Sequence, residues 1–286
     1  MEWLTVPFEV TFVQRALWGG ILVSAICALA GTWVVLRGMA FLGDAMSHGL
    51  LPGVAVAALL GGNLFVGAVI SAAVMTAGVT ALGRTPRLSQ DTGIGLLFVG
   101  MLSLGVIIVS RSQSFAVDLT GFLFGDVLAV RLQDLLLLAA ALLAALLVSV
   151  LGHRAFLALA FDARKAHTLG LRPRLAHAVL LGLLGLAIVA SFHIVGTLLV
   201  LGLLIAPPAA ALPWARSVHG VMAAAALLGT LATFGGLLLS WHLSTAAGAT
   251  VAALAVSLFF ISHVLSALRD RRTRHAHAPV PVPEVN

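Results

Sequence analysis

Long apolar runs separated by short polar segments recur along the whole chain. Most of them can cross about 30 Å of hydrocarbon as an α-helix. The pattern predicts membrane-spanning helices near residues 16–36, 38–60, 64–82, 93–111, 132–152, 177–192, 194–212, 219–240 and 247–268. Because 177–192 and 194–212 are short, we expect eight or nine spans. The predicted fold class is an all-α polytopic membrane protein.

The composition of the chain also indicates that it lies in a lipid bilayer. Of 286 residues, 61% are hydrophobic and 9% are charged, whereas soluble domains carry about a quarter charged residues. We therefore expect one transmembrane domain over 16–268. An interfacial segment, 1–15, precedes it, and a basic tail with His and Pro, 269–286, follows it and is expected to be disordered.

The basic residues predict the orientation of the chain in the membrane. They gather near Arg84 and Arg87, in the loop 153–176 and in the tail 269–286. Such clusters mark the cytoplasmic side of a membrane protein, so we interpret the net charge of +6 as topology and expect no nucleic-acid partner. With nine spans, all three clusters share one side, the N-terminus lies outside and the C-terminus inside. If 194–212 does not cross, this arrangement fails.

An ionisable pair, Asp44 and His48, lies within the second apolar run. An unpaired charge at membrane depth costs several kcal/mol, and residues four apart share one face of a helix. Together they offer an oxygen and a nitrogen ligand to one divalent cation. The alternative is structural: Asp44 begins the helix and His48 bonds a neighbouring one. His193 and His242 are weaker metal-ligand candidates, since such histidines more often lie at the interface or bond between helices.

No Gly-x-x-x-x-Gly-Lys-Ser/Thr motif occurs, so the chain lacks that means of binding nucleotide phosphates. We expect no enzymatic site and no resident cofactor. Energy for transport would come from a partner that binds ATP or from an ion gradient.

Four ordered segments resemble the permeases of bacterial ATP-binding-cassette importers for manganese, zinc and iron. They are Phe41–Gly53, Phe124–Ala129, Gly196–Pro207 and Gly248–Thr250. The resemblance implies a multi-pass protein of the bacterial inner membrane, a second permease copy in a homodimer, a cytoplasmic ATPase and an extracytoplasmic metal-binding protein. It also implies that Asp44 and His48 contact the transported metal. Among the three metals we expect zinc.

The loop 153–176 contains a candidate coupling helix. Asp162 can cap its start and Gly170 can end it, with Phe161 on an apolar side and Arg164 and Lys165 on a polar one. Such a helix could instead rest on anionic membrane lipid. The family resemblance favours docking of the ATPase.

Two other functions remain open from the sequence. The chain could be a gradient-driven secondary cation transporter in which Asp44 and His48 relay protons. It could also be a membrane scaffold in which the pair only locks helices together.

Overall fold

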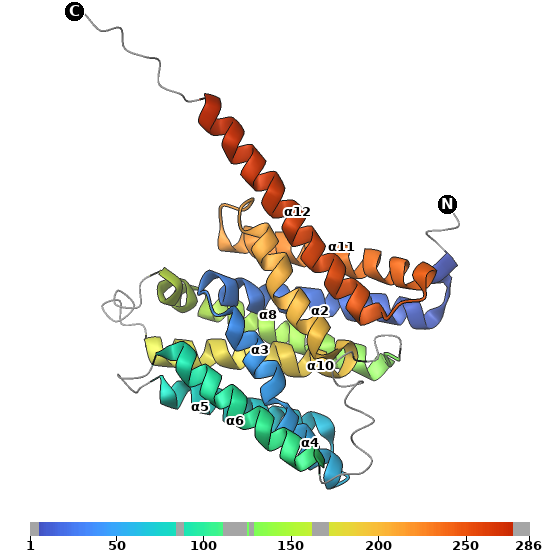
Figure 1. Ribbon diagram of the computed structural model, residues 1–286, viewed down its shortest axis with the longest axis vertical. Coiled ribbons are helices and arrows are strands. Elements are labelled where there is room, and N and C mark those ends of the chain that lie inside the picture. The colour runs from blue at the N-terminus through green and yellow to red at the C-terminus, as the bar shows by residue number, and fades with distance from the viewer. Residues whose placement is uncertain (1–5, 84–88, 111–124, 126–128, 162–171, 277–286) are drawn as a thin grey trace, which may run out of the picture.

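A computed structural model describes residues 6–83, 89–110, 125, 129–161 and 172–276. Within these residues the regular structure is helical (Figure 1). The elements are η1 (Val6–Glu9), α2 (Thr11–Leu36), α3 (Ala40–Gly49), α4 (Leu51–Leu59), α5 (Leu64–Leu82), α6 (Gln90–Ser110), α8 (Leu132–Phe161), α10 (Pro173–Ala211), α11 (Val218–Leu243) and α12 (Ala247–Ala276).

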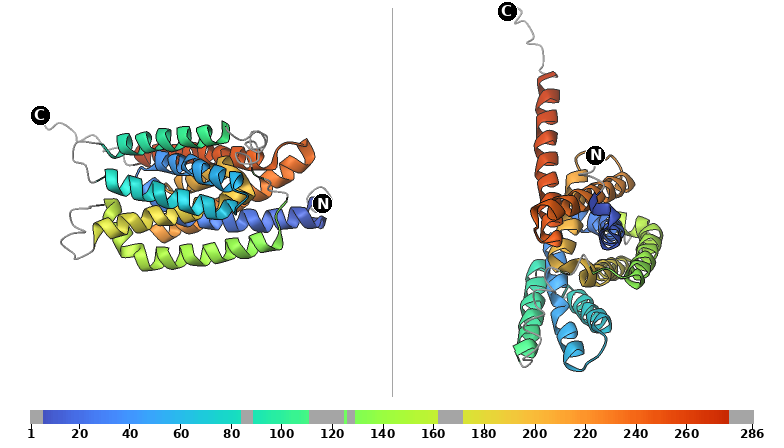
Figure 2. Two further views of the ribbon diagram at one scale, coloured as in Figure 1. Left: turned by 90° about the horizontal axis from the view of Figure 1, so that it is seen from below. Right: turned by 90° about the vertical axis from the view of Figure 1, so that its right-hand side faces the viewer.

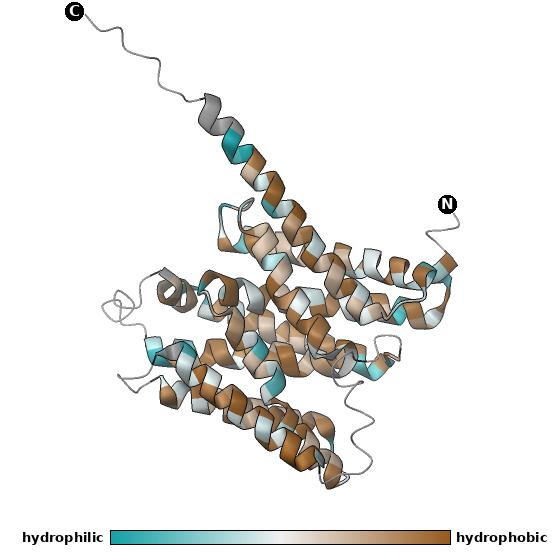
Figure 3. Cartoon of the chain, in the orientation of Figure 1, coloured by the Kyte–Doolittle hydropathy of each residue, from teal (hydrophilic) through white to brown (hydrophobic). Residues whose placement is uncertain are grey.

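The helices have the length and the surface of membrane spans. Within the described residues, eight helices are long and apolar enough to cross a bilayer, with α3 and α4 counted as one helix. A further apolar helix, Val195–Ala211, is shorter. Hydrophobic residues run along the full length of the helices (Figure 3), and many of the large ones are exposed. On α8, for example, Leu143, Leu147 and Leu151 are exposed. Exposing so large an apolar surface to water would be unfavourable, so lipid surrounds the bundle.

The long helix α10 reverses direction at Gly196, where the backbone takes φ 73° and ψ 161°. Its first part begins beside the end of α2, because Arg37 Nη1 lies 2.9 Å from His177 Nδ1. Its second part runs parallel to α2: Cys27 lies against Val200, and Gly31, one turn later, lies against Leu204 and Pro208. Both ends of α10 therefore lie at the same membrane face.

That face is the basic one. It holds the end of α2, the start of α10 and the α10–α11 connection, and the end of α12 joins them because Arg269 Nη2 donates to the Pro213 carbonyl at 3.0 Å. The start of α2 lies at the opposite face, where Phe12 packs near Trp241 of α11. Arg37, Arg172, Arg174, Arg216 and Arg269 thus share one side, which the positive-inside rule assigns to the cytoplasm.

Several boundaries differ from those predicted. The first span begins at Thr11 instead of residue 16, so part of the predicted interfacial segment is helical. Helix α12 continues to Ala276, so the predicted tail begins as helix. Helix α8 extends to Phe161 and α10 begins at Pro173, which shortens the predicted loop 153–176. Propensity favours these extensions because the added residues include no helix breaker except Pro173, which suits a helix start.

The bundle has two lobes. Helices α4, α5 and α6 gather at the bottom in Figure 2, right, and α2, α8 and α11 gather above them. Helix α10 packs against helices of both lobes, including α2, α8, α11 and α5. α3 packs on α6 and α10, so it lies where the lobes meet.

Close packing of α2 on α10 generates a prediction. A methyl group at Gly31 would collide with the backbone carbonyl of Leu204. We expect Gly31→Ala to destabilise the protein by about 1–3 kcal/mol, measured as a lower thermal unfolding temperature in detergent. Gly100→Ala is the control, because nothing lies within 4 Å of its added carbon. Equal unfolding temperatures for the two variants would contradict the packing.

Candidate metal-transit site

Asp44 and His48 form a pair on α3. Their side chains approach to 3.5 Å between Asp44 Oδ1 and His48 Nε2, and they are 35% and 30% exposed. At about 1.5 Å per residue, Asp44 lies about 6 Å and His48 about 12 Å from the helix start at Ala40. His48 is therefore near the middle of the span Ala40–Leu59.

Neighbouring helices hold α3 on two sides and leave the pair open on a third. Gly43 faces Leu204 of α10, where an added carbon would come within 3.0 Å of the leucine side chain. Met46 is fully buried. On the other side Phe98 of α6 meets the rings of both Phe41 and His48 edge-on, at 5.9 and 5.8 Å between centres. The carboxylate and the imidazole thus share a fixed, partly exposed face of a single chain.

The helix is interrupted between α3, which ends at Gly49, and α4, which begins at Leu51. The face of α3 that carries Asp44 and His48 ends at this break. Pro52 has no N–H to donate to the His48 carbonyl, one turn earlier. Ser71 of α5 bridges the same break: its hydroxyl donates to the Gly49 carbonyl at 2.7 Å and accepts from the Gly53 N–H at 3.3 Å. The sequence predicts a freed carbonyl near His48, but it gives no signal that a serine on the next helix bonds the neighbouring backbone groups.

α4 and α5 approach closely enough for this bridge because glycines face each other. A carbon added to Gly53 would collide with the Gly67 carbonyl, and one added to Gly67 would collide with the Gly53 carbonyl. Backbone contact of this kind is typical of membrane helices with small residues at the interface. It brings Ser71, which is 3% exposed, within reach of the α3–α4 break.

The remaining candidates do not complete a metal shell here. His242 lies in the last turn of α11 at the outer face, away from α3, which begins at the inner face. His193 lies within α10, just before the reversal, and its side chain is not among those described. Within the described residues, no group of three or more His, Cys, Asp and Glu side chains could hold a metal. Within the described residues, Asp44 and His48 are therefore the candidate donor pair.

The predicted coupling residues lie at the edge of the described structure. Phe161 ends α8, and its side chain is not described. Asp162, Arg164, Lys165 and Gly170 lie outside the described residues. The flanking ends, Phe161 and Pro173, lie at the basic face of the bundle.

Comparison with known proteins identifies the family. The model of the "ABC 3 transport family" matches residues 9–266. The chain belongs to this family. It is a membrane permease with a transport role, and it spans the bacterial inner membrane several times. The resemblance and the all-α polytopic fold predicted from the sequence are confirmed.

Individual members of the family are similar over nearly their whole length. The chain is 34% identical over 265 residues to the "Manganese transport system membrane protein MntC" of Halalkalibacterium halodurans, covering 93% of this chain and 91% of the relative. It is 35% identical over 270 residues to a Haemophilus influenzae protein described as "Probable iron transport system membrane protein", covering 94% and 99%.

A solved structure shows the same arrangement. A chain of "PsaBC from Streptococcus pneumoniae in complex with Fab" superposes with a TM-score of 0.80 at 32% identity, covering 91% of this chain and 94% of that one. At this coverage the overall fold of the chain is one that has been solved before.

The bridge at Ser71 generates a prediction. Ser71→Ala would leave the Gly49 carbonyl and the Gly53 N–H without this partner, and each unsatisfied buried group costs about 1–3 kcal/mol. We expect a lower thermal unfolding temperature. Ser257→Ala is the control, since that exposed hydroxyl bonds only its own helix, at the Ala253 carbonyl. An unchanged unfolding temperature for Ser71→Ala would show that the bridge contributes nothing.

Proposed function

We propose that this permease moves a divalent transition metal into the cytoplasm past Asp44 and His48, powered by a separate ATPase subunit. The observation that carries the proposal is the partly exposed carboxylate–imidazole pair within a membrane span. The pair is not packed shut, and it lies within the span Ala40–Leu59, with His48 in the last turn of α3. Its open face allows a cation to exchange part of its water shell for two protein ligands.

The cost of leaving this face against lipid supports a second permease copy as partner. A charged side chain near the bilayer centre costs about 2.5–3.5 kcal/mol on insertion scales. Asp44 is 35% exposed in the single chain, so lipid contact there is unfavourable. A homodimer that encloses the two α3 faces around a water-filled passage removes that contact and brings two such pairs together.

A site with only two protein ligands suits a metal ion that passes through better than one that stays bound. A closed four-ligand shell holds a metal tightly, whereas conduction requires a site that the ion can also leave. One carboxylate and one imidazole leave most coordination positions to water or to the second copy. This open donor set supports passage of the metal as substrate, with no resident metal.

Manganese and ferrous iron are the favoured substrates, and they are the metals in the names of the two relatives above. The zinc preference drawn from the sequence has no specific support there. Carboxylate, imidazole and water serve all three ions, so the donor set alone does not select among them. Zinc is therefore a competitor to be measured.

The remaining partners follow from the family. We propose that the ATPase docks on the cytoplasmic segment around Phe161, Asp162, Arg164, Lys165 and Gly170. An extracytoplasmic binding protein delivers the metal at the face where α2 begins. ATP binds on the partner subunit, and this chain carries no ATPase site of its own.

Uptake by whole cells tests the role of the pair. Asp44→Asn keeps the shape of the side chain and removes its charge, and His48→Gln removes the imidazole. We expect each to lower manganese or iron uptake by at least about tenfold, because a contact to a charged group contributes about 1.5–3 kcal/mol and tenfold corresponds to about 1.4 kcal/mol. Asp91→Asn and His263→Gln, on exposed faces of α6 and α12, are matched controls that keep uptake. Normal uptake by Asp44→Asn at equal membrane abundance would exclude the role.

Energy dependence separates the proposal from its rivals. We expect uptake to require the ATPase subunit with its nucleotide-binding lysine intact and to survive an uncoupler while ATP is maintained. Uptake that persists without the ATPase and collapses with the uncoupler would instead favour a gradient-driven transporter with a proton relay. Loss of stability in Asp44→Asn, with no transport by the wild-type chain, would favour a scaffold.

A further inference from the structure

Two histidines from different helices meet near the cytoplasmic face. The ring centres of His153 on α8 and His219 on α11 lie 4.4 Å apart, with 31° between the ring planes. His219 is the second residue of α11, which begins at the basic face, and α8 and α11 both pack on α2. This histidine pair shares no residue with the metal-transit site on α3.

The indole of Trp33 on α2 lies beside the histidine pair. Trp33 is fully buried, and its ring meets those of His153 and Phe156 edge-on, at 5.6 and 5.4 Å between centres. Among the described residues, none accepts a hydrogen bond from its Nε1–H. Burying an N–H group without a partner is unfavourable. The indole therefore indicates that a polar ligand binds next to His153.

A second buried polar side chain occurs on the same face of α8. Ser149 precedes His153 by one turn and Phe156 by two, so the three share one stripe of the helix. Ser149 is 5% exposed, and within the described structure its hydroxyl has no hydrogen-bond partner. The buried hydroxyls of Ser24 and Ser47, in contrast, donate to carbonyls four residues earlier on their own helices. Two unpaired polar groups thus accompany the histidine pair.

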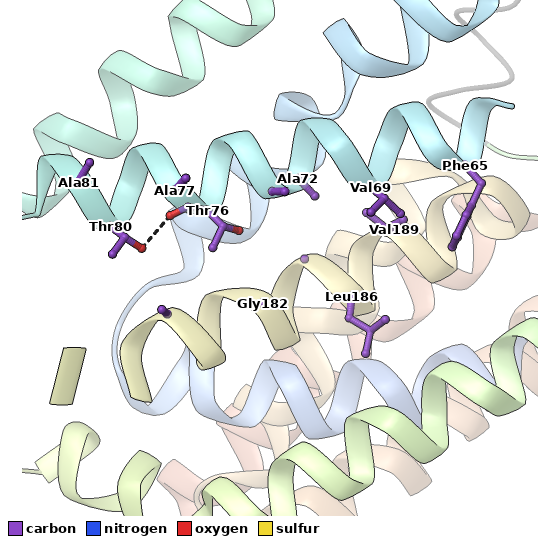
Figure 4. A pocket seen from close by; sticks show the side chains of 13 residues that line it. Phe65, Val69, Ala72, Thr76, Ala77, Thr80, Ala81, Gly182, Leu186 and Val189 are labelled. Atoms are coloured by element: carbon purple, nitrogen blue, oxygen red, sulfur yellow. Dashed lines mark hydrogen bonds between the residues drawn. The ribbon is translucent and has the colours of Figure 1, made fainter. Parts of the chain in front are cut away.

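The groove between α5 and the first part of α10 differs in both respects. Its walls are mostly apolar, and histidine is not among the residues that line it. The Thr80 hydroxyl within it donates to the Thr76 carbonyl at 2.8 Å (Figure 4). The histidine pair is therefore the better candidate for a ligand site.

Two imidazoles at this spacing can bind one metal ion. A ring nitrogen binds zinc at about 2.0–2.1 Å, which puts the ring centre about 3.2 Å from the metal. Two rings at right angles around one ion then have centres about 4.5 Å apart, close to the 4.4 Å between His153 and His219. His219 is exposed, so its ring has room to turn a nitrogen toward the shared ion.

We propose that His153 and His219 form a second metal site, which takes a divalent transition-metal ion from the cytoplasm. Water completes the shell, and the Trp33 N–H and the Ser149 hydroxyl are available to hydrogen-bond it. Two imidazoles without a carboxylate favour nickel, copper and zinc over manganese and magnesium. The bound ion joins α8 to α11, so the site responds to metal that is already inside the cell.

Thermal unfolding of the chelator-treated, detergent-purified full chain tests the site, with nickel, zinc, manganese or magnesium chloride added back. A ligand that binds only the folded state raises the unfolding temperature saturably. We expect nickel and zinc to raise it by about 3 °C or more, and manganese and magnesium by clearly less. Equilibrium dialysis against nickel counts the ions bound to each chain.

Variants of the two histidines assign the effect. His219→Phe keeps an aromatic ring beside His153 and removes the ligand nitrogens. We expect it to change the unfolding temperature without metal by no more than about 2 °C, to lose the nickel response and to bind one nickel ion fewer. His153→Gln should lose the response as well. His263→Phe is the matched control and should keep it, because His263 is also exposed and stacks on Phe259.

The double variant Asp44→Asn, His48→Gln separates this site from the metal-transit site, and it should keep the nickel response. An unchanged response and nickel count in His219→Phe would overturn the proposal and leave the histidine pair as a ring contact only. So would an equal loss in His263→Phe. A response that is lost in the double variant and kept in His219→Phe would assign the ion to Asp44 and His48 instead.

Discussion

Inside a bilayer no water completes the hydrogen bonds of the backbone, so each departure from regular helix must be compensated within the protein. The position of the Asp44–His48 pair depends on this constraint. The second span is divided at Pro52, and Ser71 on α5 bonds backbone groups on both sides of the division. This bridge allows α3 to end as a separate half-helix with His48 near its last turn. It joins the end of α3 directly to α5, in addition to the packing of α3 on α6 and α10.

The reversal of α10 obeys the same constraint by a different route. Gly196 adopts a positive φ that side chains disfavour. Gly125 packs so closely on it that a carbon added to Gly125 would collide with the Gly196 backbone. α10 therefore turns back at Gly196. Its second part lies parallel to α2 and places Leu204 against Gly43, beside Asp44.

The sequence predicted the fold class, the spans and the pair because these depend on local pattern: the length of apolar runs, the side of the basic residues and the spacing of four between Asp44 and His48. It left the direction of 194–212 open, since hydropathy does not encode a reversal at one glycine. It did not find Ser71, because the partner of a freed backbone group lies on another helix. The sequence did not predict the contact between Arg37 and His177 either, because these residues are 140 positions apart and lie on different helices. α12 continues to Ala276, past the predicted start of the tail, because a basic composition does not by itself prevent a helix from continuing.

The turn at Gly196 also decides where the two ends of the polypeptide are found. Among the described helices it gives α10 two legs, and the start of α2 lies at the face opposite the one where α12 ends. A fluorescent protein attached ahead of α2 would have to be exported and fold outside the cell's reducing interior. The same protein attached after α12 would mature in the compartment where it is synthesised, which makes that end the suitable one for a reporter.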